Sequence, residues 1–150
     1  AGASQAAVMQ AMAMAPRPHL RGAALPLLTQ PQFDRLLWCA DFACVRGEDS
    51  VLRALWAGAP FLWHIYRQHD GAHAAKLEAF MDRMLDGADA PLAAALRRLA
   101  RAWNGLGDWA APDAWPDLSA WRLQVEGWRD ALAAQPDLVS RLLAFVAQRR

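Results

Sequence analysis

The chain has 150 residues and 55% of them are hydrophobic, which suits one ordinary domain with an apolar core. Sixteen basic residues nearly balance fifteen acidic ones, for a formal net charge of +1. This balance provides no broad basic surface, so we expect neither nucleic acid nor a membrane as a partner. No apolar run reaches the roughly 20 residues that span a bilayer.

The two cysteines, Cys39 and Cys44, lack the spacing of a redox pair and are few for a secreted domain. We therefore expect reduced thiols and a cytoplasmic protein. The segment Ala1 to Ala15 has no basic residue and does not begin with Met, so it does not resemble a signal peptide. We expect the sequence to begin inside a longer protein.

The first elements are short. Ala1 to Ala15 favours a helix, which Pro16 ends. The apolar run Ala23 to Leu28 predicts a buried strand, and Phe33 to Ala40 has apolar residues at helical spacing.

A strand, a helix and a second strand follow. Phe42 to Val45 predicts a buried strand, and Phe61 to Tyr66 predicts another from its aromatic and β-branched residues. Between them, Asp49 or Ser50 can cap a helix over Val51 to Ala57. This order predicts one βαβ unit of a parallel sheet.

After Gly71 the pattern is helical almost to the end of the chain. The expected helices are Ala72 to Leu85, Pro91 to Asn104, Leu118 to Ala134 and Pro136 to Gln148. The predicted fold class is α/β: a partial Rossmann-like domain with a short parallel sheet and a helical C-terminal region. In the absence of internal repeats we expect residues 1–150 to form a single, truncated domain.

The segment Arg46 to Ser50 lies where the first strand of the βαβ unit turns into its helix. Ligands of parallel sheets bind at such turns, outside the carboxyl ends of the strands. Gly47 lets the backbone approach a ligand, and the free N–H groups at the helix start favour an anion such as a diphosphate. Arg46 adds a cationic donor beside them.

The carboxylates in this segment indicate a second kind of contact. Glu48 and Asp49 would repel a diphosphate but accept hydrogen bonds from sugar or ribose hydroxyls, and the Ser50 hydroxyl can donate to phosphate. The pattern therefore suits a nucleotide that bears a sugar. It equally fits an ordinary capped helix start with Arg46 in solvent, and the pattern alone leaves both interpretations open.

A longer run of residues resembles a known family, the protein-arginine rhamnosyltransferases of translation elongation factor P. The matching segments are Gln30 to Trp38, Asp41-Phe42, Val45 to Ser50, Trp56 to Gly58, Pro60-Phe61, Trp63 to Tyr66, Asp70 to His73, Lys76 to Phe80 and, more loosely, Ala102 to Gly105. The resemblance covers Gln30 to Phe80 densely and the remainder faintly.

The resemblance implies an inverting glycosyltransferase of GT-B architecture, built from two Rossmann-like domains. Such an enzyme moves L-rhamnose from dTDP-β-L-rhamnose to an arginine of elongation factor P. This chain would be the donor-nucleotide-binding C-terminal part, without the N-terminal acceptor domain that carries the catalytic aspartates. We therefore expect the fragment alone to be inactive.

The family likeness also implies roles for residues of the turn. Glu48 is the catalytic residue, whose loss abolishes activity, while Arg46, Asp49 and Ser50 hold the nucleotide and diphosphate. In the implied mechanism the acceptor guanidinium attacks the anomeric carbon, and Arg46 with the helix terminus stabilises the departing dTDP. Neither a cofactor nor a metal is expected, and the enzyme is expected to be a monomer.

Three further residues are implied to form the pocket for the base. Phe33 stacks on the thymine, Gln30 contacts its polar edge and Tyr66 lines the same pocket. The family has an aromatic residue near Leu27, so one wall of the pocket departs from its pattern.

The sequence leaves two other functions open. One is a catalytically silent module of the same fold that binds a nucleotide sugar or another protein. The other is a helical scaffold, which the density of the resemblance disfavours.

Overall fold

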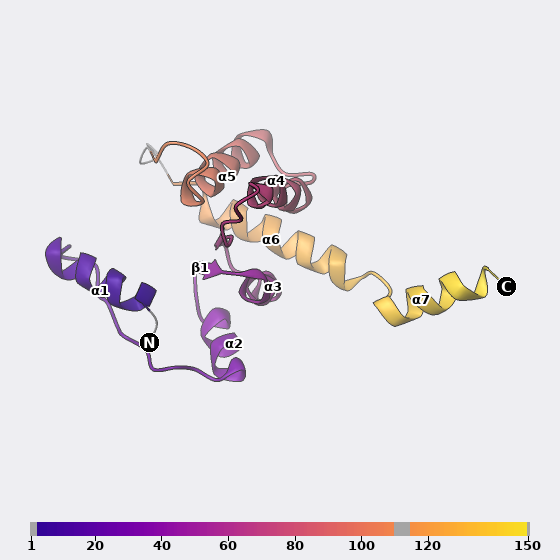
Figure 1. Ribbon diagram of the computed structural model, residues 1–150, viewed down its shortest axis with the longest axis horizontal. Helices are drawn as coiled ribbons and strands as arrows, with labels where there is room; N and C mark the ends of the chain where they lie inside the picture. Colours follow the sequence, from indigo (N-terminus) through magenta and orange to yellow (C-terminus); the bar gives the residue numbers. More distant parts are fainter. Residues whose placement is uncertain (1–2, 110–114, 150) are drawn as a thin grey trace. The chain divides into compact units, whose positions relative to one another are not determined.

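The computed structural model describes residues 3–109 and 115–149, which form two compact units, Ala1–Leu36 and Leu37–Arg150 (Figure 1). The elements in chain order are α1 (Ala3–Met14), α2 (Gln30–Trp38), β1 (Ala43–Arg46), α3 (Glu48–Ala57), β2 (Phe61–His64), α4 (Ala72–Met84), α5 (Ala90–Trp103), α6 (Leu118–Ala133) and α7 (Leu138–Ala147). All the helices expected from the sequence are present, with shifted ends. None of the described helices is both long and apolar enough to cross a membrane.

The first unit contains α1 and no strand among its described residues. The predicted strand over Ala23 to Leu28 is therefore wrong. Pro26 lacks an N–H for a strand ladder, and Leu27 is 90% exposed, so the run is not buried. Leu25 donates its N–H to the Gln5 side chain of α1 over 3.2 Å instead of to a strand.

Helix α2 begins at Gln30, three residues before the predicted start at Phe33. The cause is a side-chain contact between Thr29 and Gln32, one half of a capping box, that the apolar spacing does not reveal. Gln32 accepts the Thr29 N–H at 2.9 Å and the Thr29 hydroxyl at 3.0 Å, while the Thr29 carbonyl accepts the Phe33 N–H at 2.9 Å.

The second unit contains the predicted βαβ unit. Strands β1 and β2 are parallel, with Ala43 opposite Phe61 and Arg46 opposite His64, and α3 connects them. Helix α3 ends at Gly58, whose left-handed conformation closes the last turn. Figure 1 shows α3 beside β1, the strand that precedes it in the chain.

Both strands differ in detail from the prediction. Strand β1 was expected to be buried, but only Val45 is, because Cys44 and Arg46 point to its exposed face. Strand β2 was expected to reach Tyr66, yet it ends at His64 because its partner β1 ends opposite it at Arg46 and the chain turns into α3 at Gly47.

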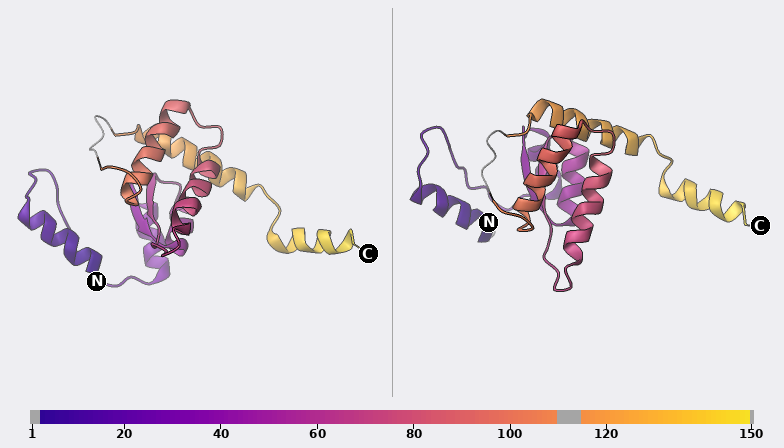
Figure 2. Two further views of the ribbon diagram at one scale, coloured as in Figure 1. Left: turned by 45° about the horizontal axis from the view of Figure 1, so that its top comes forward. Right: turned by 90° about the horizontal axis from the view of Figure 1, so that it is seen from above.

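Helices α4 and α5 lie side by side in Figure 2; α5 packs on β2, while α6 contacts α3 and α4. Phe80 of α4 makes ring contacts with residues on both β2 and α6: Trp63 at a centroid distance of 4.8 Å, Trp128 at 5.3 Å and Phe61 at 6.2 Å. Arg97 of α5 also pairs with Asp82 of α4 over 2.7 Å. The aromatic cluster fixes β2 relative to α4 and α6.

Asn104, directly after α5, is buried and acts as a substitute for a third strand. Its Oδ1 accepts the Ile65 N–H at 2.9 Å, and its Nδ2 donates to the Trp63 carbonyl at 2.9 Å. These two backbone groups face away from β1. The amide therefore satisfies the open edge of β2 just before the chain reaches Tyr66.

We expect Asn104→Ala to lower the free energy of unfolding by about 2–4 kcal/mol, since it leaves a buried N–H and a buried carbonyl unpaired. Chemical denaturation followed by tryptophan fluorescence measures this. Arg98→Ala, an exposed change on the same helix, is the control and should shift stability by less than about 0.5 kcal/mol. Equal effects of the two substitutions would contradict the assigned role of Asn104.

Candidate functional site

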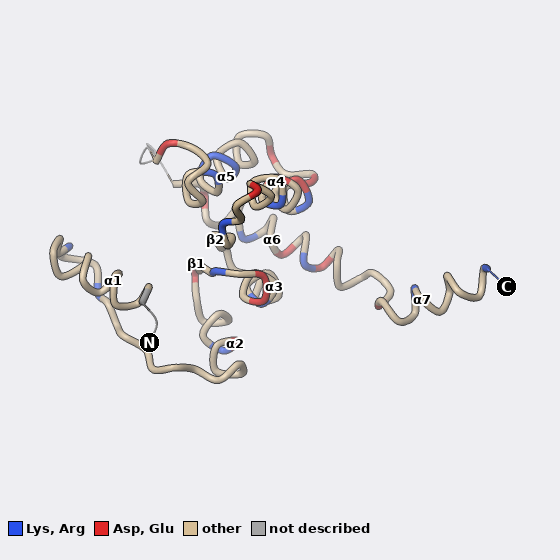
Figure 3. Tube along the Cα trace, viewed as in Figure 1, with Lys and Arg blue, Asp and Glu red and all other residues tan. Residues whose placement is uncertain are grey.

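The carboxyl ends of β1 and β2 bring charged and aromatic residues to one edge of the sheet. Arg46 ends β1, and Tyr66 and Arg67 follow β2. In Figure 3 basic residues lie at these strand ends, beside the acidic first turn of α3. This edge is where parallel sheets bind ligands.

Gly47 makes the turn from β1 into α3. Its φ of 83° and ψ of 171° belong to a region that only glycine occupies readily. Its N–H donates to the His64 carbonyl over 3.2 Å, and its own carbonyl accepts the indole N–H of Trp63 at 3.0 Å. Both partners, His64 and Trp63, belong to β2, so β2 fixes the turn that follows β1.

Helix α3 begins at Glu48, with Gly47 as the N-cap and no side-chain cap hydrogen bond. The predicted cap by Asp49 or Ser50 is wrong, because the helix starts one residue earlier and both lie inside its first turn. The first N–H groups of an α-helix have no acceptor within the helix. Here the backbone N–H groups of residues 48–50 occupy those positions at the edge of the sheet.

Arg46 stacks on Tyr66. The guanidinium carbon lies 4.9 Å from the ring centroid, in a cation–π contact between the ends of the two strands. A β-carbon added at Gly47 would come within 2.8 Å of the same ring. Glycine at 47 therefore permits Tyr66 to lie close to the turn, where it supports the arginine.

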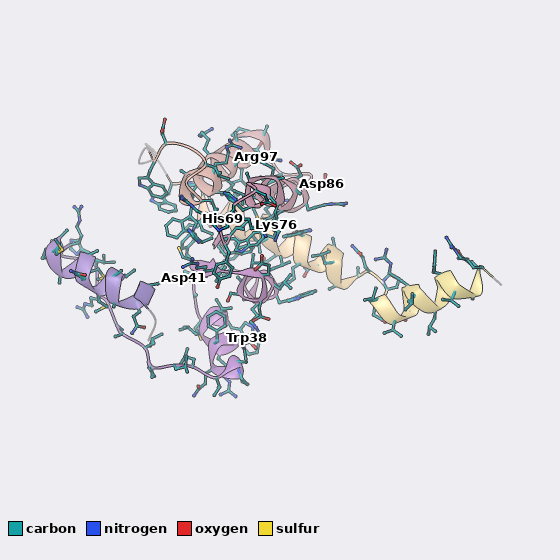
Figure 4. The ribbon with its side chains drawn as sticks, viewed as in Figure 1. Trp38, Asp41, His69, Lys76, Asp86 and Arg97 are labelled. Carbon is teal, nitrogen blue, oxygen red and sulfur yellow. The ribbon has the colours of Figure 1, made fainter. Side chains whose placement is uncertain are left out.

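The two carboxylates of the α3 first turn point to different partners. Glu48 pairs with Lys76 of α4, with 3.2 Å between Oε1 and Nζ, while Asp49 pairs with Arg53 of its own helix over 2.8 Å. Lys76, labelled in Figure 4, lies between α4 and α3. Glu48 is thus directed toward α4 and Asp49 along α3.

His64 lies at the same edge, opposite Arg46. Its pKa is lowered below the ordinary 6.5 by burial first and then by the nearby charges of Arg46 and Arg67. Its Nδ1 is buried and has no hydrogen-bond partner among the described residues. A neutral imidazole is the form that this setting favours.

The cluster of His69, Asp70 and His73 forms a local turn. Asp70 accepts the Ala72 N–H at 3.0 Å, and His73 Nδ1 accepts the Gln68 N–H at 3.4 Å. Within residues 3–109 and 115–149 no group of three or more His, Cys, Asp or Glu side chains could hold a metal ion.

The structure places Arg46, Glu48, Asp49, Ser50 and Tyr66 in the second unit, around the end of β1 and β2. The remaining site residues predicted from the sequence lie on the first turns of α2, in the first unit: Gln30, which is exposed, and Phe33, which is half-buried. They are three residues apart and share a helix face. Their base-binding role stays a prediction.

Two residues of the edge received no role from the sequence. Trp63 is expected only as part of the strand Phe61 to Tyr66, yet its indole N–H donates to the Gly47 carbonyl and so holds the turn. Lys76 belongs to one of the segments that resemble the family; it is the single lysine beside fifteen arginines, a composition to which the sequence alone gives no functional meaning.

Comparison with known proteins identifies the family to which the chain belongs. The profile of the family described as elongation-factor P (EF-P) rhamnosyltransferase EarP matches residues 2–147. The chain belongs to this family. It is 47% identical to a protein-arginine rhamnosyltransferase of Pseudomonas aeruginosa over 135 residues and 48% identical to one of Pseudomonas putida over 126 residues.

A solved structure supports the EarP assignment in three dimensions. It is described as the structural basis for EarP-mediated arginine glycosylation of translation elongation factor EF-P, and it matches 99% of this chain with a TM-score of 0.70 and 36% identity. The chain covers 50% of that structure, and 87% of the chain matches 35% of the Pseudomonas aeruginosa relative. It thus spans between a third and a half of the length of these EarP proteins.

We expect Gly47→Ala to destabilise this chain by about 1–3 kcal/mol, because alanine rarely adopts the required φ and its β-carbon collides with Tyr66. Thermal unfolding measures the loss. Gly127→Ala is the control, since a β-carbon there meets nothing within 4 Å and the site is helical; it should stabilise by about 0.5–1 kcal/mol. A neutral Gly47→Ala would mean that the turn is not constrained as described.

His64 predicts a loss of stability in mild acid. The pKa of His64 is lower in the folded chain than in the unfolded chain. As the pH falls through 6.5, the unfolded chain therefore binds a proton before the folded chain does, and this favours unfolding. We expect the unfolding temperature to drop from pH 7.5 to 5.5, and His64→Gln to reduce that drop. An identical pH dependence in His64→Gln and His19→Gln, a change at an exposed histidine, would contradict this account.

Proposed function

We propose that this chain is the donor-binding part of an inverting GT-B glycosyltransferase. The enzyme transfers L-rhamnose from dTDP-β-L-rhamnose to an arginine side chain of translation elongation factor P. The EarP relatives are named as protein-arginine rhamnosyltransferases, and the related structure is described with EF-P glycosylation. A translation factor as acceptor implies action in the cytoplasm.

The observation that carries the proposal is the convergence of Arg46 with the first turn of α3 at the carboxyl edge of the sheet. A diphosphate there would accept hydrogen bonds from the backbone N–H groups of the turn and lie at the positive end of the helix dipole. The Arg46 guanidinium adds charge-assisted donors, and the Ser50 hydroxyl can add a neutral one. The proposal includes no metal, because Arg46 and the positive end of the α3 dipole already offset part of the phosphate charge.

The side of the turn that faces α4 suits the sugar. The Glu48 carboxylate lies there, paired with Lys76, and its oxygens accept hydrogen bonds from hydroxyls. Asp49 stays on the α3 side with Arg53 and suits the ribose or nucleotide. On this assignment Glu48 is the catalytic residue of the chain because it contacts the transferred rhamnose.

The family resemblance assigns three residues to the base. Tyr66 is 52% exposed beside Arg46, so its ring has a free surface for a ligand. The proposal gives Phe33 the stacking contact with thymine and Gln30 the contact with its polar edge. These roles rest on the family resemblance.

In the proposed reaction a guanidinium nitrogen of the acceptor arginine attacks the anomeric carbon of rhamnose. The bond from that carbon to the diphosphate oxygen breaks, dTDP leaves with the electron pair, and the anomeric configuration inverts. The proton of the attacking nitrogen passes to a carboxylate in the part of the enzyme outside this chain. Arg46 and the α3 terminus stabilise the charge that develops on dTDP.

Donor binding tests the proposal most simply in the full-length enzyme. We expect isothermal titration calorimetry to show tighter binding of dTDP than of UDP or GDP. Arg46→Ala should weaken dTDP binding about 10- to 100-fold, since hydrogen bonds to charged groups contribute about 1.5–3 kcal/mol. Arg98→Ala removes an exposed arginine of α5 and serves as the matched control.

Measurement of EF-P rhamnosylation distinguishes a loss of donor binding from a loss of the chemical step. Glu48→Gln should abolish rhamnosylation, measured by intact-protein mass spectrometry, while dTDP still binds. The proposal fails if Arg46→Ala, Ser50→Ala and Glu48→Gln all retain the donor affinity and the turnover of the unmodified enzyme.

A further inference from the structure

The ion pair of Lys76 and Glu48 is the contact that connects α4 to the first turn of α3 at the site. The two residues are 28 positions apart in sequence, and their charged atoms are 3.2 Å apart. Lys76 lies one turn into α4, so its long side chain reaches across to the neighbouring helix. The pair places a cation beside Glu48, the first residue of the α3 turn to which we assign the diphosphate.

Stability does not explain this pair. The side chains of Lys76 and Glu48 are 42% and 55% exposed, and surface ion pairs of this kind contribute about 0–1 kcal/mol. Glu48 already gains from its place at the positive end of the α3 dipole. Removal of the Lys76 charge should therefore cost the fold little.

The type of cation matters at this position. An arginine fork would engage both carboxylate oxygens of Glu48, whereas the lysine ammonium is a point charge that contacts Oε1. The lone pairs of Oε2 can then accept a hydroxyl. Lysine stands here in a chain whose other fifteen cationic residues are all arginine.

The positive charge of Lys76 also affects how close Glu48 can lie to a diphosphate. A carboxylate beside a diphosphate repels it, and a neighbouring ammonium offsets that repulsion. Glu48 can therefore remain at the diphosphate end of the site because Lys76 accompanies it.

We propose that Lys76 is a positioning residue for Glu48: it holds Oε1, leaves Oε2 to accept a hydroxyl of the donor sugar, and offsets the repulsion between Glu48 and the diphosphate. This inference rests on the proposed function. Lys76 acts through Glu48 and does not itself bind the phosphates.

A double-mutant cycle on dTDP affinity tests this in the full-length enzyme. We expect Lys76→Met to weaken dTDP binding about 3- to 10-fold when Glu48 is present. In the Glu48→Gln background the same change should alter the affinity by less than twofold, because the repelling charge is already gone. Arg98→Met is the control for removal of a cation on α5, and unfolding temperatures confirm that each variant is folded.

An equal loss of dTDP affinity on Lys76→Met in both backgrounds would overturn the inference, because it would show direct contact with the diphosphate. An unchanged affinity in both backgrounds would overturn it as well. If the unmodified enzyme does not bind dTDP, the proposed function itself fails, and that outcome is recognised before any variant is compared.

Lys76→Arg separates position from charge. It keeps the cation, so dTDP affinity should stay within twofold, but the fork occupies both oxygens of Glu48 and kcat should fall at least fivefold. Full kcat in Lys76→Arg would contradict the need for a free Oε2.

Discussion

The backbone of Gly47 is the constraint on which the site depends. Its positive φ turns the chain from β1 into α3 within one residue, and β2 holds it on both sides through the His64 carbonyl and the Trp63 indole. Because the helix starts at once, its first N–H groups face the edge where Arg46 ends the strand. A side chain at 47 would meet Tyr66, so this compact turn requires glycine.

A sheet of two strands is a small platform, and side chains complete it. The Asn104 amide takes the place of a third strand on the open edge of β2, while Phe80 packs on Trp63 from the other direction. The residue that positions the turn, Trp63, is thus fixed by two helices. This links the helical region after β2 to the geometry of the site, since α4 and α5 hold the strand that holds Gly47.

The sequence predicted the βαβ unit and all the described helices, with shifted ends, because apolar spacing and glycine stops are local signals. It failed where the outcome depends on the rest of the chain: the run at 23–28 looks like a strand but is exposed, and β2 ends at His64 because β1, its partner, turns into α3 after Arg46. The Arg46 to Ser50 turn was found from its pattern. Its pairs were not, since nothing local indicates that Lys76 reaches Glu48.

The most direct test of the central claim is a crystal structure of the full-length enzyme with dTDP. The account predicts that the diphosphate lies within hydrogen-bond distance of the Arg46 guanidinium and of backbone N–H groups in the first turn of α3. A diphosphate bound elsewhere, with that turn empty in the same crystal, would contradict it.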